Sequence, residues 1–136
     1  MSEELLQEPT RAYSPMRIDV CVSCRGPADA AEPRADRPGA RLAAALAALA
    51  PQGVEVSPVE CLSVCKRPCT ITFSAPGKWT YVYGDFTAES AENVLACAAT
   101  FAAAHDGIIP WKARPEALKR GVVARIPPFA CREAAE

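Results

Sequence analysis

Five of the seven cysteines in this 136-residue chain fall into two short groups. The first is Cys21-Val-Ser-Cys24, a C-x2-C pair, and the second is Cys61-Leu-Ser-Val-Cys65-Lys-Arg-Pro-Cys69, which begins with a C-x3-C pair. Thiolates are soft ligands that select zinc or iron-sulfur clusters, and two pairs on two short loops can close a four-thiolate site around either. The spacing therefore predicts a metal site, and it requires a fold that brings the two groups together.

Composition limits what else the chain can be. Its length and its hydrophobic content of 50% fit one compact domain. The formal net charge of -1 gives no basic field for a phosphate backbone, so we expect no nucleic-acid partner. No run reaches the roughly 18 apolar residues of a membrane span. Residues 1–15 lack the pattern of a secretory signal, so we expect a cytoplasmic protein with reduced thiols.

Periodicity predicts an α/β domain. Alternation indicates strands over residues 17–22 and 54–57, each leading directly into a cysteine group. Strands over 70–74 and 78–83 flank Ala75-Pro76-Gly77-Lys78, which is typical of a type II turn in a hairpin. Helices are expected over 39–50 and, capped by Thr87, up to Gly107. Their apolar stripes are Leu42, Leu46 and Leu49 in the first helix, and Val94, Leu95, Ala98, Phe101 and Ala102 in the second. The predicted order is β-α-β-β-β-α.

These patterns divide the chain into three segments. Residues 1–15 form a loose arm, residues 16–107 the α/β domain, and residues 108–136 a proline-rich C-terminal extension. We expect the extension to contain at most one helical turn, near Glu116 to Lys119, and to lie over the core or over a neighbouring chain. Together with the aromatic strand, its Trp111 could bury the face of a homodimer.

Three chemistries compete for the cysteines. A dithiol oxidoreductase places C-x2-C at the start of a helix, whereas Pro27, Pro33 and Pro38 postpone any helix here to about Gly39. A structural zinc site needs only four thiolates, and the first pair resembles half of a zinc knuckle, but the second pair lacks the tighter knuckle spacing. Zinc therefore remains the alternative, as a structural or metal-delivery module without a redox role.

A 2Fe-2S cluster accounts for more of the pattern, because each of its two irons takes two thiolates. Three cations, Arg25, Lys66 and Arg67, adjoin the cysteines and would raise the reduction potential of an anionic centre. The fifth thiol, Cys69, begins an alternating strand, so we expect it to pack in the core rather than to bind metal. We also expect Cys97 in the core, no partner for Cys131, and His105 on the surface.

The cysteine pairs, followed by a hairpin and a helix, resemble those of thioredoxin-like 2Fe-2S ferredoxins and the related cluster subunit of respiratory NADH dehydrogenase. More narrowly, the two cysteine groups, residues 76–85 and Ile109-Pro110-Trp111-Lys112 are similar to a family of short bacterial predicted metal-binding proteins, over about residues 17–128. The first pair here is more tightly spaced than in the ferredoxins, and Cys69 is an additional thiol.

The resemblance implies a thioredoxin-like fold whose 2Fe-2S cluster is held by Cys21, Cys24, Cys61 and Cys65. It implies an electron carrier that serves a redox partner protein and is not itself an enzyme. It also implies that two copies pair, and that the protein has a link to cobalt and cobalamin metabolism.

Overall fold

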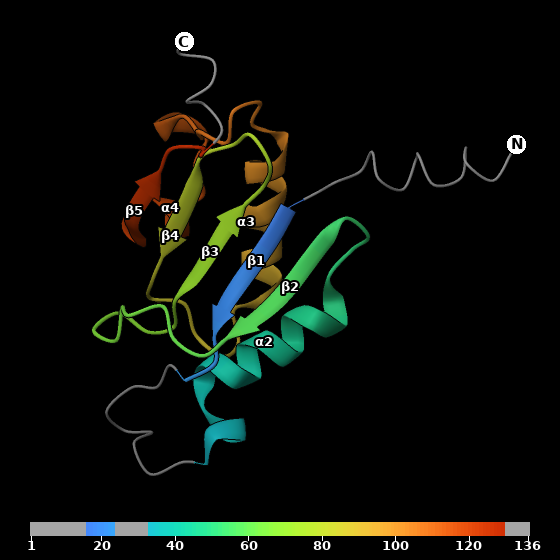
Figure 1. The fold of residues 1–136 in the computed structure, drawn as a ribbon, viewed down its shortest axis with the longest axis vertical. Helices are drawn as coiled ribbons and strands as arrows, with labels where there is room; N and C mark the ends of the chain where they lie inside the picture. Colours follow the sequence, from blue (N-terminus) through green and yellow to red (C-terminus); the bar gives the residue numbers. More distant parts are fainter. Residues whose placement is uncertain (1–15, 24–32, 130–136) are drawn as a thin grey trace, which may run out of the picture.

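One mixed sheet organises the part of the chain that the computed structural model describes, residues 16–23 and 33–129 (Figure 1). Strands β1 and β2 are parallel, and the pairs β1–β3, β3–β4 and β4–β5 are antiparallel. In the spatial order of the sheet, the strands are β2 (Val54–Val59), β1 (Met16–Cys21), β3 (Ile71–Ser74), β4 (Thr80–Tyr83) and β5 (Val122–Ile126).

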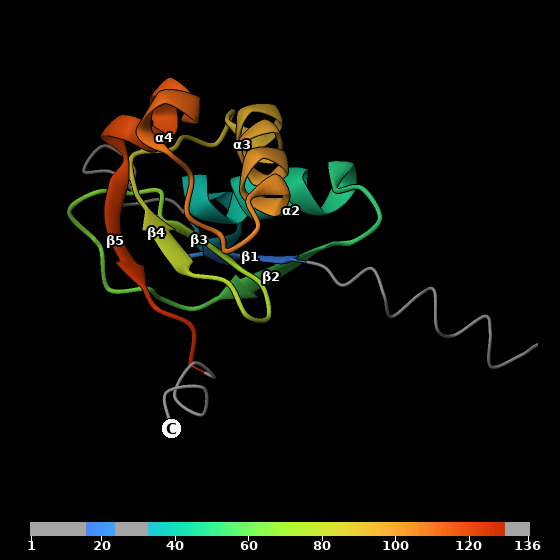
Figure 2. The same ribbon diagram turned by 90° about the horizontal axis from the view of Figure 1, so that it is seen from above.

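The helices of the described residues lie on one face of this sheet (Figure 2). They are α2 (Pro38–Leu49), α3 (Ala91–Ala103) and the short α4 (Glu116–Arg120), with 3-10 turns η2 (Arg34–Asp36) and η3 (Trp111–Ala113). No helix within residues 16–23 and 33–129 is long and apolar enough to span a bilayer. The single covered face explains the alternation of burial along β4 and most of β1, because every second side chain there enters the core.

The core lies between the sheet and helices α2 and α3. Tyr81 and Tyr83 stack with ring centroids 5.4 Å apart, and Phe73 meets Tyr83 edge-on at the same separation. Such aromatic pairs add roughly 0.5–1.5 kcal/mol beyond the area they bury. The largest fully buried side chains include Ile18, Val20, Leu42, Leu46, Ile71, Phe73, Tyr81, Tyr83, Val94 and Phe101.

Both cysteine groups leave the sheet at the same end. Because β1 and β2 are parallel, with Cys21 opposite Val59, their carboxyl ends lie side by side. Strand β3 begins and β4 ends at this end too, since Ile71 pairs with Tyr83. We call it the cysteine end. The prediction that two strands deliver the cysteines from their ends is confirmed.

The predicted order of elements is confirmed, with corrections in the helices. Leu49, expected in the core, is 51% exposed because the last turn of α2 extends beyond the edge strand β2 (Figure 1). Thr87 does not cap α3. Its hydroxyl accepts a hydrogen bond from the Glu89 amide at 3.2 Å, which closes a turn, and the helix begins only at Ala91.

The segment after residue 107 contributes more structure than its prolines suggested. The expected helical turn is α4, whose Leu118 is fully buried, and the 3-10 turn η3 precedes it. Strand β5 was not predicted, and it joins the sheet beside β4. The expected type II hairpin turn is present, with Gly77 at φ 74° and a hydrogen bond from the Lys78 amide to the Ala75 carbonyl at 3.1 Å.

Cys97 is fully buried in α3, and burial raises the pKa of its thiol to about 11. The folded state therefore holds the proton to higher pH than the unfolded chain. We expect the free energy of unfolding to fall by on the order of 2 kcal/mol as pH rises from about 9 towards 11. Urea unfolding of the native protein and Cys97→Ala at several pH values tests this.

Cys97→Ala also leaves a small cavity, which lowers the free energy of unfolding at every pH. The two proteins are therefore compared by how steeply this free energy falls with pH. Cys97→Ala should show a shallower loss of stability over the same pH range. Burial raises the pKa of Tyr83 as well, so some loss at the highest pH remains in both proteins. Parallel profiles for the two proteins would contradict the prediction.

Candidate metal centre

Cys21 is the last residue of β1, and its side chain lies against the start of the second cysteine loop. It is 3% exposed, and its Sγ lies 3.8 Å from the Glu60 carbonyl oxygen and 3.6 Å from Ser23 Oγ. The Ser23 hydroxyl donates to the same Glu60 carbonyl at 2.6 Å. Since Glu60 directly precedes Cys61, these contacts join the first cysteine turn to the second.

Cys61 and Cys65 are both exposed thiols on the loop between β2 and β3. Between them, Ser63 adopts a left-handed conformation with φ 64°, and its backbone amide donates to Cys61 Sγ at 3.2 Å. A hydrogen bond to sulfur is a common way to hold a metal-binding sulfur in place. The loop thus presents one thiol with a positioned donor and a second thiol open to solvent.

The fourth predicted ligand, Cys24, lies outside the described residues. Within residues 16–23 and 33–129, no three cysteine, histidine or acidic side chains converge on a single metal position. The donor set nevertheless fits a cluster or zinc, because Cys21, Cys61 and Cys65 are thiols on adjoining loops and each of the two loops supplies a pair.

The electrostatics of the cysteine end favour an anionic centre. Helices α2 and α3 both begin there, while the far end of α3 is fixed by Lys78, whose Nζ donates to the Ala102 carbonyl at 2.7 Å. Helix amino termini carry partial positive charge. Arg37, which precedes α2, donates to the Ser23 carbonyl at 3.4 Å, and its buried Nε has no partner among the described residues.

The cations named from the sequence have different surroundings. Lys66 is exposed and pairs with no described residue. Arg67 instead forms an ion pair with Asp85 at 2.7 Å, which largely neutralises it. Arg25 lies outside the described residues.

The other described cysteines, Cys69 and Cys97, are buried. Cys69 is 2% exposed, and its backbone exchanges hydrogen bonds with Phe86 at 2.8 and 3.2 Å, as expected for a packed residue. Cys97 is in the core as predicted, and His105 is exposed as predicted. Cys131 lies outside the described residues.

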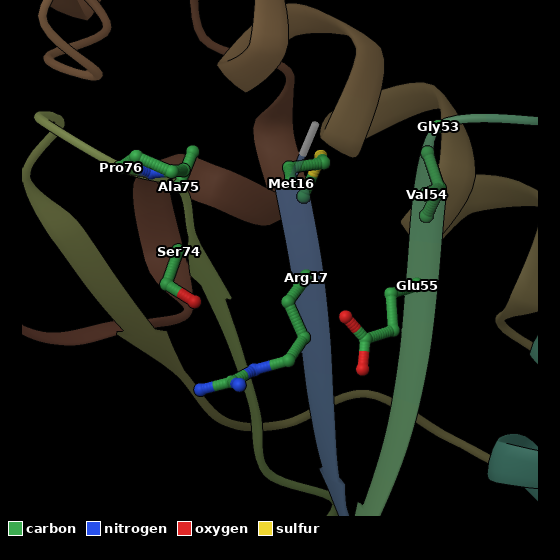
Figure 3. Close-up of a pocket in the computed structure, with 8 residues that line it drawn as sticks. All are labelled: Met16, Arg17, Gly53, Val54, Glu55, Ser74, Ala75 and Pro76. Atoms are coloured by element: carbon green, nitrogen blue, oxygen red, sulfur yellow. The ribbon is translucent and has the colours of Figure 1, made fainter. Parts of the chain in front are cut away.

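Two pockets open elsewhere on the surface. One of about 260 Å³ lies beside Cys69, between the start of α2 and residues 86–89. The larger, of about 570 Å³, lies at the end of the sheet opposite the cysteines, where Arg17, Glu55 and Ser74 project from three neighbouring strands (Figure 3). Neither of these two pockets is lined by Cys61 or Cys65.

Residues 18–128 match the model of a family described as a protein of unknown function, DUF1636. The chain belongs to this family. The match covers most of the chain and includes all four predicted ligands. No curated protein matches this chain.

Two solved structures of a thioredoxin-like 2Fe-2S ferredoxin from Aquifex aeolicus share the fold. One is 18% identical with a TM-score of 0.53, covering 85% of this chain and 97% of the ferredoxin. The other is 17% identical with a TM-score of 0.52, covering 82% and 98%. At this identity the likeness establishes the fold alone. This DUF1636 protein therefore has the thioredoxin-like α/β fold that the resemblance predicted.

Sequence reasoning missed the groups that support the cysteines. The amide of Ser63 gave no signal, because a left-handed residue is usually glycine or asparagine. Arg37 lies in a charged, proline-rich stretch whose composition indicated only a loop. The pairing of Arg67 with Asp85 joins residues far apart in sequence, and no local pattern marks it.

Proposed function

We propose that this DUF1636 protein binds a 2Fe-2S cluster through Cys21, Cys24, Cys61 and Cys65 and carries single electrons to a redox partner protein. It would act in the cytoplasm as a carrier and not as an enzyme. The observation that carries the proposal is the meeting of Cys21 with the Cys61–Cys65 loop at the end of the sheet where both long helices begin.

The chemistry of the loop supports a redox centre. A 2Fe-2S cluster accepts and donates one electron at a time, and its potential depends on hydrogen bonds to sulfur, nearby charge and exposure. Here the Ser63 amide, the Arg37 guanidinium and Lys66 supply donors and positive charge. The exposed positions of Cys61 and Cys65 would let a partner protein approach the sulfur atoms directly.

The similarity of the fold to that of ferredoxins also supports an electron carrier. The Aquifex aeolicus proteins of similar fold are 2Fe-2S ferredoxins by their description. The pairing of two copies and the link to cobalt and cobalamin metabolism rest on the resemblance and remain predictions.

Zinc is the second candidate, because four thiolates also satisfy a tetrahedral zinc site. Its specific support is that exposed thiols on a surface loop suit a module that delivers or holds a metal without electron transfer. The two candidates differ in colour, metal content and magnetism.

Purification without oxygen decides between them. The cluster predicts a red-brown protein with about two irons and two sulfides per chain, and an EPR signal after reduction with dithionite. A colourless protein with one zinc per chain would overturn the electron carrier and establish the zinc module.

A further inference from the structure

Arg67 lies within the second cysteine group, between Cys65 and Cys69, but its side chain leaves that loop. Its Nε and Nη2 donate to Asp85 Oδ2 at 3.0 and 2.7 Å. The Nη2 also donates to the Arg120 carbonyl at 3.0 Å, and the Nη1 to the Val122 carbonyl at 3.4 Å. One guanidinium therefore bridges the cysteine loop to Asp85, two residues after β4, to the end of α4 and to the start of β5.

The backbones beneath this side chain are stacked directly on one another. The Asp85 amide donates to the Arg67 carbonyl at 3.0 Å, and the Gly84 amide to the Gly121 carbonyl at 2.9 Å. A Cβ on Gly84 would lie 2.6 Å from the Arg67 carbonyl oxygen, and one on Gly121 would lie 2.9 Å from the Gly84 carbonyl oxygen. Only glycines allow three segments to approach so closely.

The inner side of the cysteine loop is braced by the same residue. The Thr70 hydroxyl lies 3.4 Å from the Arg67 carbonyl and 3.5 Å from the Val64 carbonyl, where it can donate to either. The loop carrying Cys61 and Cys65 is thus tied at Arg67 to the sheet on one side and to the α4–β5 segment on the other.

We propose that Arg67 is a positioning residue of the metal centre. It latches the Cys61–Cys65 loop to the α4–β5 segment, so that retention of the metal depends on residues far from the cysteines in sequence. The inference rests on the proposed function only in requiring a metal on these thiols, and it applies to a cluster or to zinc. The role is geometric, because Asp85 already neutralises the charge of Arg67.

Groups that orient metal ligands from outside commonly change metal affinity by about 10 to 100-fold when they are altered. Arg67→Lys keeps the charge but loses the planar fork that reaches three acceptors. Asp85→Asn removes the paired charge while suiting the left-handed backbone of this residue, which has φ 69°. Both variants should fold, and both should release metal about 10-fold faster than the native chain.

The experiment measures how fast the native metal passes from the full-length holoprotein to a colorimetric chelator. The metal followed is iron or zinc, according to what the purified protein contains. Visible circular dichroism or EPR, for a cluster, should also change in both variants. Arg120→Ala is the matched control, since among the described residues its side chain bonds only Glu116, while its carbonyl still accepts from Arg67. Its release rate and spectra should match the native protein.

A second control separates positioning from loss of stability. Phe101→Leu lowers the melting temperature through the core, at the far end of α3, and should leave metal release unchanged. Native release rates in Arg67→Lys and Asp85→Asn, or equally fast release in Phe101→Leu, would overturn the latch. Zinc in the native protein would overturn the electron carrier alone, and a native protein that holds neither metal would overturn both.

Discussion

Cys61→Ser and Cys65→Ser are each expected to abolish the bound cluster, reducing the iron content from about two per chain to nearly none. Serine offers a hard oxygen where the irons require a soft thiolate, and each iron depends on two such ligands. Both cysteines are exposed, so the substitutions should change the stability of the metal-free fold by no more than about 0.5 kcal/mol. Iron and sulfide assays of protein purified without oxygen, with circular dichroism of the metal-free chains, measure both effects.

Two other cysteines provide matched controls for the same assay. Cys69→Ala and Cys97→Ala remove buried thiols that pack in the core, so both variants should keep the iron while losing some stability. If Cys69→Ala lost its iron and Cys65→Ser kept it, Cys69 and not Cys65 would be the fourth ligand. The comparison therefore tests which thiols bind and not only whether a thiol is needed.

The sequence predicted those parts of the fold that local periodicity governs. Ile18 and Val20 alternate with polar residues because one face of β1 enters the core, and Pro76-Gly77 marks a turn whose geometry only a few residues adopt. Periodicity also predicted that two strands lead into the cysteine groups. Their parallel pairing, which places both groups at the cysteine end, came from the structure.

What the sequence could not predict depends on contacts between distant segments. Strand β5 is flanked by Gly121 and by Pro127 and Pro128, which read as loop signals, and it forms only because β4 offers an unpaired edge. Leu49 continues a perfect helical stripe, yet its burial depended on how far the sheet extends beneath it. Periodicity records which residues share a face and not what lies opposite that face.

In the candidate site too, local pattern predicted some features and contacts between distant segments determined the others. The identity of the ligands was available from spacing, because a C-x2-C and a C-x3-C are chemically informative by themselves. The amide that donates to Cys61 and the contacts that anchor Arg67 could not be predicted from spacing, since each arises from tertiary packing. These supporting contacts would tune how firmly the thiols hold a metal.

Gly84→Ala is expected to weaken both the fold and the metal centre. The added methyl would lie 2.6 Å from the Arg67 carbonyl oxygen and 2.8 Å from Arg67 Cβ, so the backbone of one segment must move. Forcing an extra methyl into a packed region costs about 1–3 kcal/mol, and we expect a value near the top of that range because backbone yields less readily than a side chain. Urea unfolding of the metal-free protein measures it.

Because the displaced backbone belongs to the cysteine loop, the same variant should release its metal several-fold faster than the native protein. Gly53→Ala is the control. It adds the same methyl where no atom lies within 4 Å, but strains a residue at φ 94°, so it should cost about 1–2 kcal/mol and leave metal release unchanged. If both variants released metal equally fast, lability would follow global stability. Faster release in Gly84→Ala alone would mean that the close approach of Arg67, Gly84 and Gly121 holds the metal loop in place.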